Sequence, residues 1–334
     1  MDYRYLGRSA LQVSPLCLGA MMFGGATDET TAKRIVDKAR ARGINFIDTA
    51  DGYNGGASEE VVGRSIAGDR HHWVVATKFG HRISPAPNHG GQSRKWIMQD
   101  VEDSLRKLGT DYIDLLYFHK ADVGVQFEEA LRTIQDLMTQ GKLRYYGVSN
   151  FKGWRIAEIC RAADAIGMDR PAASQPLYNM VDRLSEVEQL PAAGHYGLGV
   201  VPYSPLARGI LSGKYAPGAE PPEGSRAARK DVRILQTEWR PESLDIAQAV
   251  AERAAAKGLS TVAFAIAWVI KNRFVSAAIA GPRTEEQWDS YLPALDAVLD
   301  AEDEAFVDAL VPPGHASTPG YSDPAYPIEG RVVR

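Results

Sequence analysis

Residues 73–78 read WVVATK and residues 112–119 read YIDLLYFH, two short apolar runs with one amphipathic segment, Ser93–Leu108, between them. Branched and aromatic side chains of the kind found in both runs favour strands. The segment between them has the length and apolar spacing of a helix. A strand, a helix and a second strand in this order predict a parallel pair joined by a helical crossover.

The same alternation extends in both directions along the chain. The predicted strands are Leu16–Gly19, Phe46–Asp48, Trp73–Lys78, Ile113–His119, Arg144–Val148, Ala172–Gln175, Gly199–Tyr203 and Val275–Ala280. Predicted helices include Asp28–Arg42, Ser93–Leu108, Phe127–Gln140, Trp154–Ile166 and Pro241–Lys257. Several strands are continuously apolar, as expected where both faces of a sheet are covered. The pattern favours an α/β fold of the closed (β/α)8 TIM-barrel type over an open doubly wound sheet.

Three segments fall outside this repeat, although residues 1–334 are predicted to form a single barrel domain. Residues 1–14 contain RYLG and LQVS, which predict a small β-hairpin over the bottom of the barrel. Residues 207–240 form a long loop after the seventh strand, and loops of this length are usually functional or disordered. Residues 311–334 form a C-terminal tail, with prolines and tyrosines, after a last short helix.

The composition is that of an ordinary globular protein, with 334 residues, 45% hydrophobic and 24% charged. A formal net charge of −4 gives no electrostatic footprint for nucleic acid or an anionic membrane. Cys17 and Cys160 stand apart from any metal-binding pattern, so we expect no metal and a reducing compartment. The N-terminus lacks a signal-peptide pattern, and Thr261–Ile270, the longest apolar stretch, is too short to span a membrane. We therefore expect a soluble, cytoplasmic protein.

Titratable residues follow three successive strands at their carboxyl ends, where (β/α)8 barrels hold their chemistry. INFIDTADGY (residues 44–53) places Asp48 at a strand tip and Tyr53 in the next loop. WVVATK ends in Lys78, and YIDLLYFH ends in His119. Each residue alone has a structural interpretation, such as a helix cap for Asp48, a solvated side chain for Lys78 or a structural hydrogen bond for His119. Their occurrence at successive strand ends predicts one catalytic site at the barrel mouth.

The chain resembles the aldo-keto reductase superfamily over nearly its full length, from GRSALQVSPLCLG to GPRTEEQ. The motifs that carry the resemblance are NFIDTADGY, VVATKFG, LLYFH, GVSNF, SQPLYN and YSPLARGIL. The chain is similar to bacterial-type reductases and also to members that resemble β-subunits of potassium channels. This resemblance implies an NADP(H)-dependent oxidoreductase, whose catalytic tetrad is matched position for position by Asp48, Tyr53, Lys78 and His119.

Such a tetrad is suited to the reversible reduction of an aldehyde or ketone to an alcohol, in which negative charge develops on the carbonyl oxygen. Tyr53 is predicted to donate the proton in reduction and to accept it in the reverse oxidation. The phenol pKa is ordinarily about 10, and we expect a nearby Lys78 ammonium to lower it. Asp48 would keep Lys78 in place and charged, and His119 would orient the carbonyl through a hydrogen bond.

The sequence contains no GxGxxG motif at the start of a strand–helix unit, so it does not predict a Rossmann site. The resemblance implies instead a nicotinamide cofactor extended across the barrel mouth. Ser149, Asn150 and Gln175 match positions that bind the carboxamide, and Tyr203 matches the ring that stacks on nicotinamide. A Ser-Asn pair after a strand is also a common turn, and a tyrosine there can be a rim aromatic.

Further cofactor contacts are predicted after the seventh and eighth strands, at Ser204, Leu206, Arg208, Lys214, Gly281, Arg283 and Gln287. We expect Thr284 to cap a helix whose N-terminus, beside Arg283, would favour a phosphate group. Pairing of Arg283 with a 2′-phosphate would favour NADPH, with NADH possible but less favoured. Ser290 and Tyr291 stand where the family often has a Glu-Asn pair, which is a departure at the adenine end.

Apolar residues follow the first and third strands: Met21, Met22 and Phe23, and then Phe79. We expect them to border the carbonyl group of a small-molecule substrate, and methionines there suit varied shapes. The sequence leaves open the physiological substrate, the direction and stereochemistry of the reaction, and whether the protein is a monomer or a homo-oligomer.

Two other functions stay open. The first is a cofactor-binding regulatory module, similar to channel β-subunits, with slow turnover. The second is an enzyme that forms a Schiff base on Lys78. An adjacent Asp48 that keeps Lys78 protonated opposes the second function.

Overall fold

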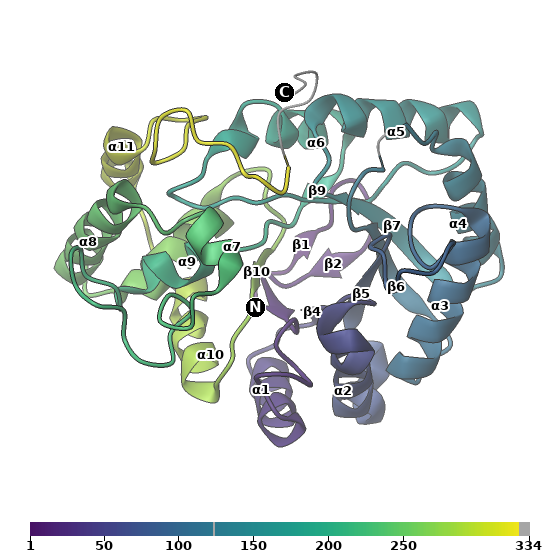
Figure 1. Cartoon of the computed structure of the whole chain (residues 1–334), viewed down its shortest axis with the longest axis horizontal. Coiled ribbons are helices and arrows are strands. Elements are labelled where there is room, and N and C mark those ends of the chain that lie inside the picture. The colour runs from purple at the N-terminus through teal and green to yellow at the C-terminus, as the bar shows by residue number, and fades with distance from the viewer. Residues whose placement is uncertain (123, 327–334) are drawn as a thin grey trace. The chain divides into compact units, whose positions relative to one another are not determined.

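The fold is built on parallel strands that form a ring in the described part of the chain, residues 1–122 and 124–326 of a computed structural model (Figure 1). The strands are β3 Leu16–Gly19, β4 Phe46–Asp48, β5 Val74–Phe79, β6 Ile113–Phe118, β7 Leu143–Ser149, β8 Ala173–Gln175, β9 Gly199–Val200 and β10 Ala278–Ala280. They pair in the order β10-β3-β4-β5-β6-β7-β8-β9. The parallel bridges Val200↔Val275 and Tyr203↔Ile279 join the segment of β9 to that of β10, which closes the ring. The predicted (β/α)8 barrel is therefore confirmed.

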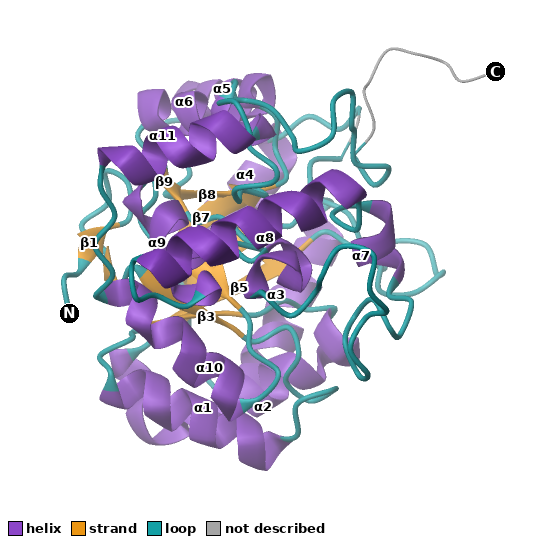
Figure 2. Cartoon of the chain, turned by 90° about the vertical axis from the view of Figure 1, so that its left-hand side faces the viewer, coloured by secondary structure: helices purple, strands orange, loops and turns teal. Residues whose placement is uncertain are grey.

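Helices lie outside the ring, as Figure 1 shows for α1 to α4 and Figure 2 for α5 and α6 beside β7 and β8. Their bounds are α1 Glu29–Ala41, α2 Ala57–Ile66, α3 Arg94–Leu108, α4 Glu128–Thr139, α5 Gly153–Ala165 and α6 Gln189–Tyr196, with 3-10 turns η1 Tyr53–Gly56 and η2 Ala67–His72. The side chain of Asp28 accepts a hydrogen bond from the Thr31 amide, and that of Ser93 from the Trp96 amide. These two predicted helix starts are therefore N-caps, one residue before the helix itself.

The chain divides into two compact units. The first contains the ring of strands and comprises residues 1–177, 188–203 and 270–289, of which residue 123 lies outside the described part. The second comprises residues 178–187, 204–269 and the described residues from 290 onward. The remaining elements are η3 Leu184–Glu186, η4 Ala207–Ser212, α7 Val232–Gln236, α8 Pro241–Ala256, α9 Thr261–Lys271, α10 Glu285–Tyr291, η5 Leu292–Leu295 and α11 Ala301–Leu310.

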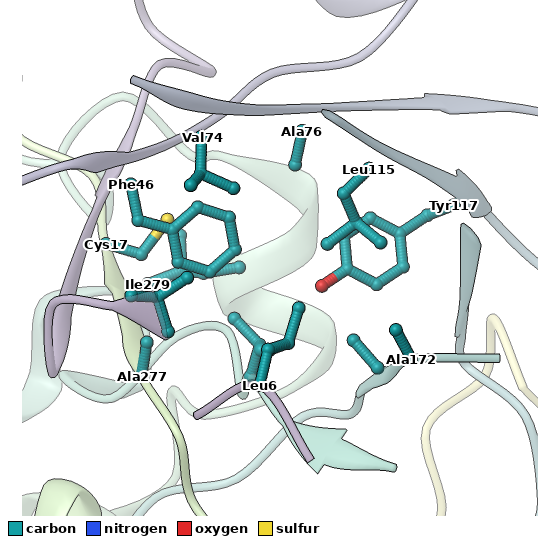
Figure 3. Close-up of a cluster of buried hydrophobic side chains, with 13 residues drawn as sticks. Leu6, Cys17, Phe46, Val74, Ala76, Leu115, Tyr117, Ala172, Ala277 and Ile279 are labelled. Carbon is teal, nitrogen blue, oxygen red and sulfur yellow. The ribbon is translucent and has the colours of Figure 1, made fainter. Parts of the chain in front are cut away.

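Side chains from alternate strand positions fill the interior of the ring (Figure 3). Val74 and Ala76 of β5 and Leu115 and Tyr117 of β6 belong to this cluster, because residues two apart in a strand share a face. Thr77, the residue after Ala76, points to the other side of the sheet, toward Glu59 of helix α2. The barrel interior is therefore a packed core and not a channel.

The N-terminal hairpin, β1 Arg4–Tyr5 and β2 Gln12–Val13, pairs antiparallel and lies against the amino ends of the last strands. Arg4 Nη1 donates to the carbonyls of Ile270 and Val275, at 2.7 and 3.0 Å. Gly7 has a φ of +60°, and a Cβ there would come within 2.4 Å of the Gly199 amide nitrogen. Glycine lets the hairpin approach this closely, so the hairpin covers the barrel bottom as predicted.

The long loop and the tail belong to the second unit. The segment 207–240 is not irregular throughout, since it begins with η4 and contains α7. The described part of the tail is held within the unit by backbone and charged contacts. Ser317 N donates to the Val181 carbonyl at 2.9 Å, and Arg233 pairs with Asp323 at 2.7 Å. The predicted tail continues into residues 327–334, which lie outside the described residues.

Among the described residues, no single helix combines the length and the apolar character needed to cross a membrane. Helices α8 and α9 reach that combination only when they are taken together, and a bend of 95° separates them.

Candidate active site

The carboxyl ends of five neighbouring strands carry most of the predicted site residues of the first unit. Asp48 and Lys78 lie at the ends of β4 and β5, and His119 directly follows β6. Ser149 and Gln175 end β7 and β8 and are register partners. Parallel strands of one barrel end on the same face, so residues far apart in sequence come together here.

Lys78 links Asp48 and Tyr53. Its Nζ lies 2.6 Å from Asp48 Oδ1, 2.6 Å from the Thr49 carbonyl oxygen and 3.2 Å from Tyr53 Oη. These contacts use the three N–H groups of an ammonium. The Lys78 side chain is completely buried, and burial lowers its pKa, but Asp48 and Tyr53 together raise that pKa above its ordinary value. Lys78 is therefore a fixed positive charge beside the Tyr53 hydroxyl.

The structure reverses the predicted direction of the Tyr53 pKa. Lys78 does lower this pKa, as expected, but burial of the phenol is the larger influence and raises it above its ordinary value. Asp48 adds to the increase, because a negative charge disfavours the tyrosinate. Tyr53 is consequently a neutral phenol near pH 7, with a hydroxyl that can donate a proton.

The loop that carries Tyr53 is a left-handed turn. Asn54, Gly55 and Gly56 have φ values of +50°, +66° and +97°, which asparagine and glycine tolerate best. Asn54 Nδ2 donates to the carbonyls of Met21 and Phe23, at 2.9 and 2.8 Å. The sequence analysis did not identify Asn54, although the segment YNGG is a recognisable turn signal. This turn holds Tyr53 over the end of β5.

His119 lies beside the ring of Tyr53. Its ring meets the Tyr53 ring edge-on, with centroids 5.9 Å apart. Burial, followed by the charge of Lys78, lowers the His119 pKa to about 2, so the imidazole is neutral. His81, which the sequence analysis missed, lies edge-on to His119 with centroids 4.2 Å apart. Its position three residues after Lys78 in GHR was the only available signal.

Hydrogen bonds connect the residues predicted to bind a carboxamide with those of the predicted tetrad. Tyr203 Oη donates to Asn150 Oδ1 at 2.9 Å, and Asn150 Nδ2 donates to the His119 carbonyl at 2.9 Å. The Ser149 hydroxyl donates to the Gln175 carbonyl at 2.9 Å.

Gln175 also reaches the buried ion pair, since its Nε2 donates to Asp48 Oδ2 at 2.9 Å. The sequence predicted Gln175 only as a cofactor contact. The structure brings the tetrad and all four predicted nicotinamide residues into one region of the first unit.

The segment after β10 is also ordered by local contacts. Thr284 Oγ1 accepts from the Gln287 amide at 3.3 Å, as a helix cap does. The Gln287 side chain is turned back, and its Oε1 accepts from the Arg283 amide at 2.7 Å. Thr27 donates to the Arg283 carbonyl at 2.8 Å, which ties this segment to the loop after β3. A Cβ at Gly281 would lie 3.3 Å from the Gly19 carbonyl, so the two strand ends approach closely.

Four predicted cofactor contacts lie in the second unit. Arg208 Nε donates to Glu238 Oε2 at 2.9 Å and to Thr237 Oγ1 at 3.1 Å. Lys214 is exposed, with its Nζ 5.0 Å from the centroid of the neighbouring Tyr215 ring. Ser204 has a φ of +57°, and Leu206 is half-buried just before η4.

The apolar residues predicted to border the substrate differ in their exposure to solvent. Phe23 and Phe79 are completely buried, and Phe79 packs on Phe118 with ring centroids 4.7 Å apart. Both rings therefore pack within the protein, and the expectation that they border the substrate stays a prediction. Met22 is half-buried and Met21 is 40% exposed.

Comparison with known proteins agrees with this geometry. A sequence model described as the aldo/keto reductase family matches residues 15–312. The chain is 37% identical over 332 residues to the "Uncharacterized oxidoreductase YrpG" of Bacillus subtilis, with 96% of this chain and 98% of that protein covered. It is 35% identical over 303 residues to a "Probable voltage-gated potassium channel subunit beta" of Arabidopsis thaliana, with 89% and 92% covered. A "Putative voltage-gated potassium channel subunit beta" of Schizosaccharomyces pombe is also 35% identical, over 322 residues, with 93% and 90% covered.

A (β/α)8 barrel whose sequence matches this family over most of its length defines the class of the protein. The chain belongs to the aldo/keto reductase family, a family of oxidoreductases. The resemblance seen in the sequence motifs is thereby confirmed.

Proposed function

We propose that this protein catalyses the reversible, NADPH-dependent reduction of an aldehyde or ketone to an alcohol. One observation carries the proposal: the Tyr53 hydroxyl lies 3.2 Å from the buried Lys78 ammonium, which Asp48 holds at 2.6 Å. A neutral phenol beside a fixed cation can release its proton to an oxygen that gains negative charge.

The strand ends offer the chemistry that a nicotinamide group needs. Its carboxamide requires both donors and acceptors, and Ser149, Asn150 and Gln175 provide hydroxyl and amide groups of both kinds. The half-buried ring of Tyr203, held by its hydrogen bond to Asn150, offers an aromatic face. The residues therefore fit the group. When bound, the reduced nicotinamide supplies a hydride to the carbonyl carbon of the substrate.

Tyr53 supplies the proton in this proposal. As hydride reaches the carbon, the carbonyl oxygen takes the proton from Tyr53 Oη, and the resulting tyrosinate is stabilised by Lys78. In the oxidation of an alcohol, the same tyrosinate accepts the proton. Asp48 keeps Lys78 charged and in place, and Gln175 fixes the second oxygen of Asp48. Asp48 and Gln175 therefore act on the substrate only through Lys78 and Tyr53.

His119 orients the substrate. The imidazole is neutral, so it can donate an N–H to the carbonyl oxygen without giving up the proton. Its Nδ1 is buried and has no hydrogen-bond partner among the described residues. We assign the hydrogen to Nε2, the nitrogen that remains for the substrate oxygen. Burial and, after it, the charge of Lys78 disfavour a charged imidazolium here.

The preference for NADPH rests on Arg283, the cation next to the helix cap at Thr284. We retain Ser204, Leu206, Arg208, Lys214, Gly281 and Gln287 as proposed cofactor contacts. The substrate would be a small carbonyl compound that meets the half-buried Met22 at the mouth.

A second function is favoured by two relatives. Proteins named as potassium channel β-subunits are 35% identical to this chain over most of its length. A regulatory module would bind the nicotinamide cofactor and turn over slowly. We place this function second, because the Tyr53–Lys78–Asp48 arrangement is assembled for proton transfer.

A cofactor titration followed by turnover separates the two functions. Protein fluorescence is followed as NADPH or NADH is added, and absorbance at 340 nm is then followed with a panel of small aldehydes. The proposed function predicts tight NADPH binding and a steady loss of absorbance over many turnovers. Binding without turnover would support the regulatory module, and the absence of binding would reject both.

A further inference from the structure

A second charged cluster lies behind the turn that carries Tyr53. It consists of three buried carboxyl groups, those of Asp51, Glu59 and Asp100, and the ammonium of Lys107, whose side chain is 26% exposed. Glu59 Oε1 accepts from Thr77 at 2.7 Å, and Glu59 Oε2 lies 3.4 Å from Lys107 Nζ. The proposed reaction uses none of these four groups.

Packing between α2 and α3, which lie side by side in Figure 1, delivers Lys107 to this cluster. A Cβ at Gly63 would lie 2.3 Å from the Leu108 carbonyl oxygen, so α2 rests directly on the end of α3. Lys107 is the preceding residue, and its side chain extends beneath the turn η1. A Cβ at Gly56 would come within 2.8 Å of Lys107 Nζ. The ammonium thus lies between Gly56, the last residue of the turn, and Glu59.

The cluster contacts both segments that carry catalytic groups. Asp51 Oδ1 accepts from the Gly52 amide at 2.7 Å, immediately before Tyr53. The Asp51 amide donates to the Lys78 carbonyl at 3.3 Å. Thr77, the partner of Glu59, is the neighbour of Lys78 in β5. The cluster therefore links the segment that carries Tyr53 with the strand that carries Lys78.

Lys107 is the cation that helix α3 contributes to this cluster, where it pairs with Glu59. Burial is the main cause that raises the pKa of Asp51 to about 7 and that of Asp100 to about 9. Each of these carboxyls is also affected by Glu59, which raises its pKa, and by Lys107, which lowers it. Lys78 acts on Asp51, and Asp103 acts on Asp100. Without Lys107, buried Glu59 would lose the cation that lies 3.4 Å from its Oε2.

We propose that Lys107 is a positioning residue for the reaction proposed above: pinned between Gly56 and Glu59, its ammonium holds the Tyr53–Gly56 turn so that the Tyr53 hydroxyl stays within hydrogen-bonding distance of Lys78. The inference rests on the proposed function. It assigns no contact with substrate or cofactor to Lys107.

The experiment compares Lys107→Met with Lys95→Met, the same change at an exposed lysine on the same helix. NADPH affinity, kcat and KM are measured for each, together with the wild type. We expect Lys107→Met to lower kcat by about tenfold or more, with NADPH affinity within about twofold of the wild type. Lys95→Met should stay within about twofold of the wild type in all three quantities.

A double-mutant cycle with Glu59→Gln separates positioning from a general loss of stability. Glutamine keeps the size of Glu59 and removes its charge. In that background Lys107→Met should cost kcat less than about threefold, because the interaction has already been removed. Equal losses in both backgrounds would overturn the proposal. If Lys107→Met does not fold, Glu59→Gln is the deciding variant, and an unchanged kcat there would also overturn it.

A crystal structure of Lys107→Met gives a measurement that does not depend on turnover. We expect the distance from Tyr53 Oη to Lys78 Nζ to exceed about 3.5 Å, the limit of a hydrogen bond. An unchanged turn would contradict the positioning role. If the wild type reduces no carbonyl compound, the proposed function fails, whereas this distance still tests the role of Lys107.

Discussion

The ammonium of Lys78 lies 2.6 Å from a carboxylate oxygen of Asp48, and the two residues occupy the ends of adjacent parallel strands. Both side chains are buried, and both form further hydrogen bonds. Lys78 also contacts Thr49 and Tyr53, and Asp48 also accepts a hydrogen bond from Gln175. A buried charge without its partner is costly, so this pair connects the stability of the barrel mouth with its chemistry.

We expect Lys78→Met to destabilise the protein by about 3–5 kcal/mol, because Asp48 would remain buried without a cation. The double variant Asp48→Asn/Lys78→Met should recover part of that loss, since it removes both charges. Unfolding in urea, followed by circular dichroism, measures the two free energies. Costs that simply add in the double variant would contradict the coupling. Both variants should be inactive.

Tyr53→Phe should lower kcat by roughly a thousandfold or more, because it removes the only proposed proton donor. NADPH affinity should change by less than about twofold, since the hydroxyl is not assigned to cofactor binding. Stopped-flow absorbance and fluorescence titration measure the two effects. Turnover near the wild-type rate would show that Tyr53 is not the acid. Tyr5→Phe, at an exposed tyrosine of the hairpin, is the matched control.

The pH profile of carbonyl reduction should show a plateau through neutral pH and a fall only above about pH 10. Reduction needs the protonated phenol, and burial raises the Tyr53 pKa above its ordinary value of 10.0. His119 has a pKa of about 2 and contributes no change near pH 6 or 7. The measurement is kcat/KM against pH, which reports the groups of the free enzyme. A loss of activity between pH 7 and 9 that Tyr53 titration explains would contradict this prediction.

Because of Asp100, the free energy of unfolding should decrease as the pH rises. Its pKa is about 9 in the folded protein, with burial the main cause and Asp51 next, whereas an unfolded chain releases this proton near pH 4. Between these values the folded state binds more protons than the unfolded state, so stability decreases with increasing pH. Asp100→Asn removes the group. It should therefore be more stable than the wild type at pH 8, with a smaller difference at pH 5.

Urea midpoints at both pH values test the effect of Asp100→Asn. The control is Asp111→Asn, at an exposed carboxyl in the segment after α3. The control should show no pH-dependent gain. If Asp100→Asn were no more stable than the wild type at pH 8, Asp100 would not hold a proton in the folded protein.

Arg283→Leu should reduce the preference for NADPH. We expect kcat/KM with NADPH to fall by about tenfold or more, because a charge-assisted bond to the 2′-phosphate would be lost. The value with NADH should stay within about twofold, since NADH has no such phosphate. Steady-state kinetics with both cofactors provides the ratio. Arg132→Leu, at an exposed arginine on α4, should leave the ratio unchanged. Equal losses with both cofactors would assign Arg283 to a shared part of the cofactor.

Local patterns in the sequence were sufficient for the arrangement of strands and helices. The bounds predicted for Leu16–Gly19 and Phe46–Asp48 are those observed, because each strand is a short apolar run between polar turns. Helix ends differed where a polar residue serves as a cap, as Asp28 and Ser93 do. The sequence also indicated which side chains end each strand, and ring closure then brings those ends together.

The direction of the Tyr53 pKa depended on the tertiary structure. From the sequence, Lys78 is the evident neighbour, but the enclosure of the phenol has the larger effect. The same applies to Phe79, whose place directly after Lys78 suggested a substrate contact, although it packs on Phe118 and is buried. The meeting of Lys107 with Gly56 likewise requires α2 and α3 to be packed.

By itself the sequence determined the family, the barrel and the residues at its strand ends, since these depend on periodicity and short motifs. Only the tertiary structure decided which of those side chains are buried, which hydrogen bonds they form and how their pKa values change. The physical reason is that desolvation and electrostatic interaction depend on every atom that surrounds a group. Lys78, for example, contacts Asp48, Thr49 and Tyr53, which belong to another strand and the loop that follows it.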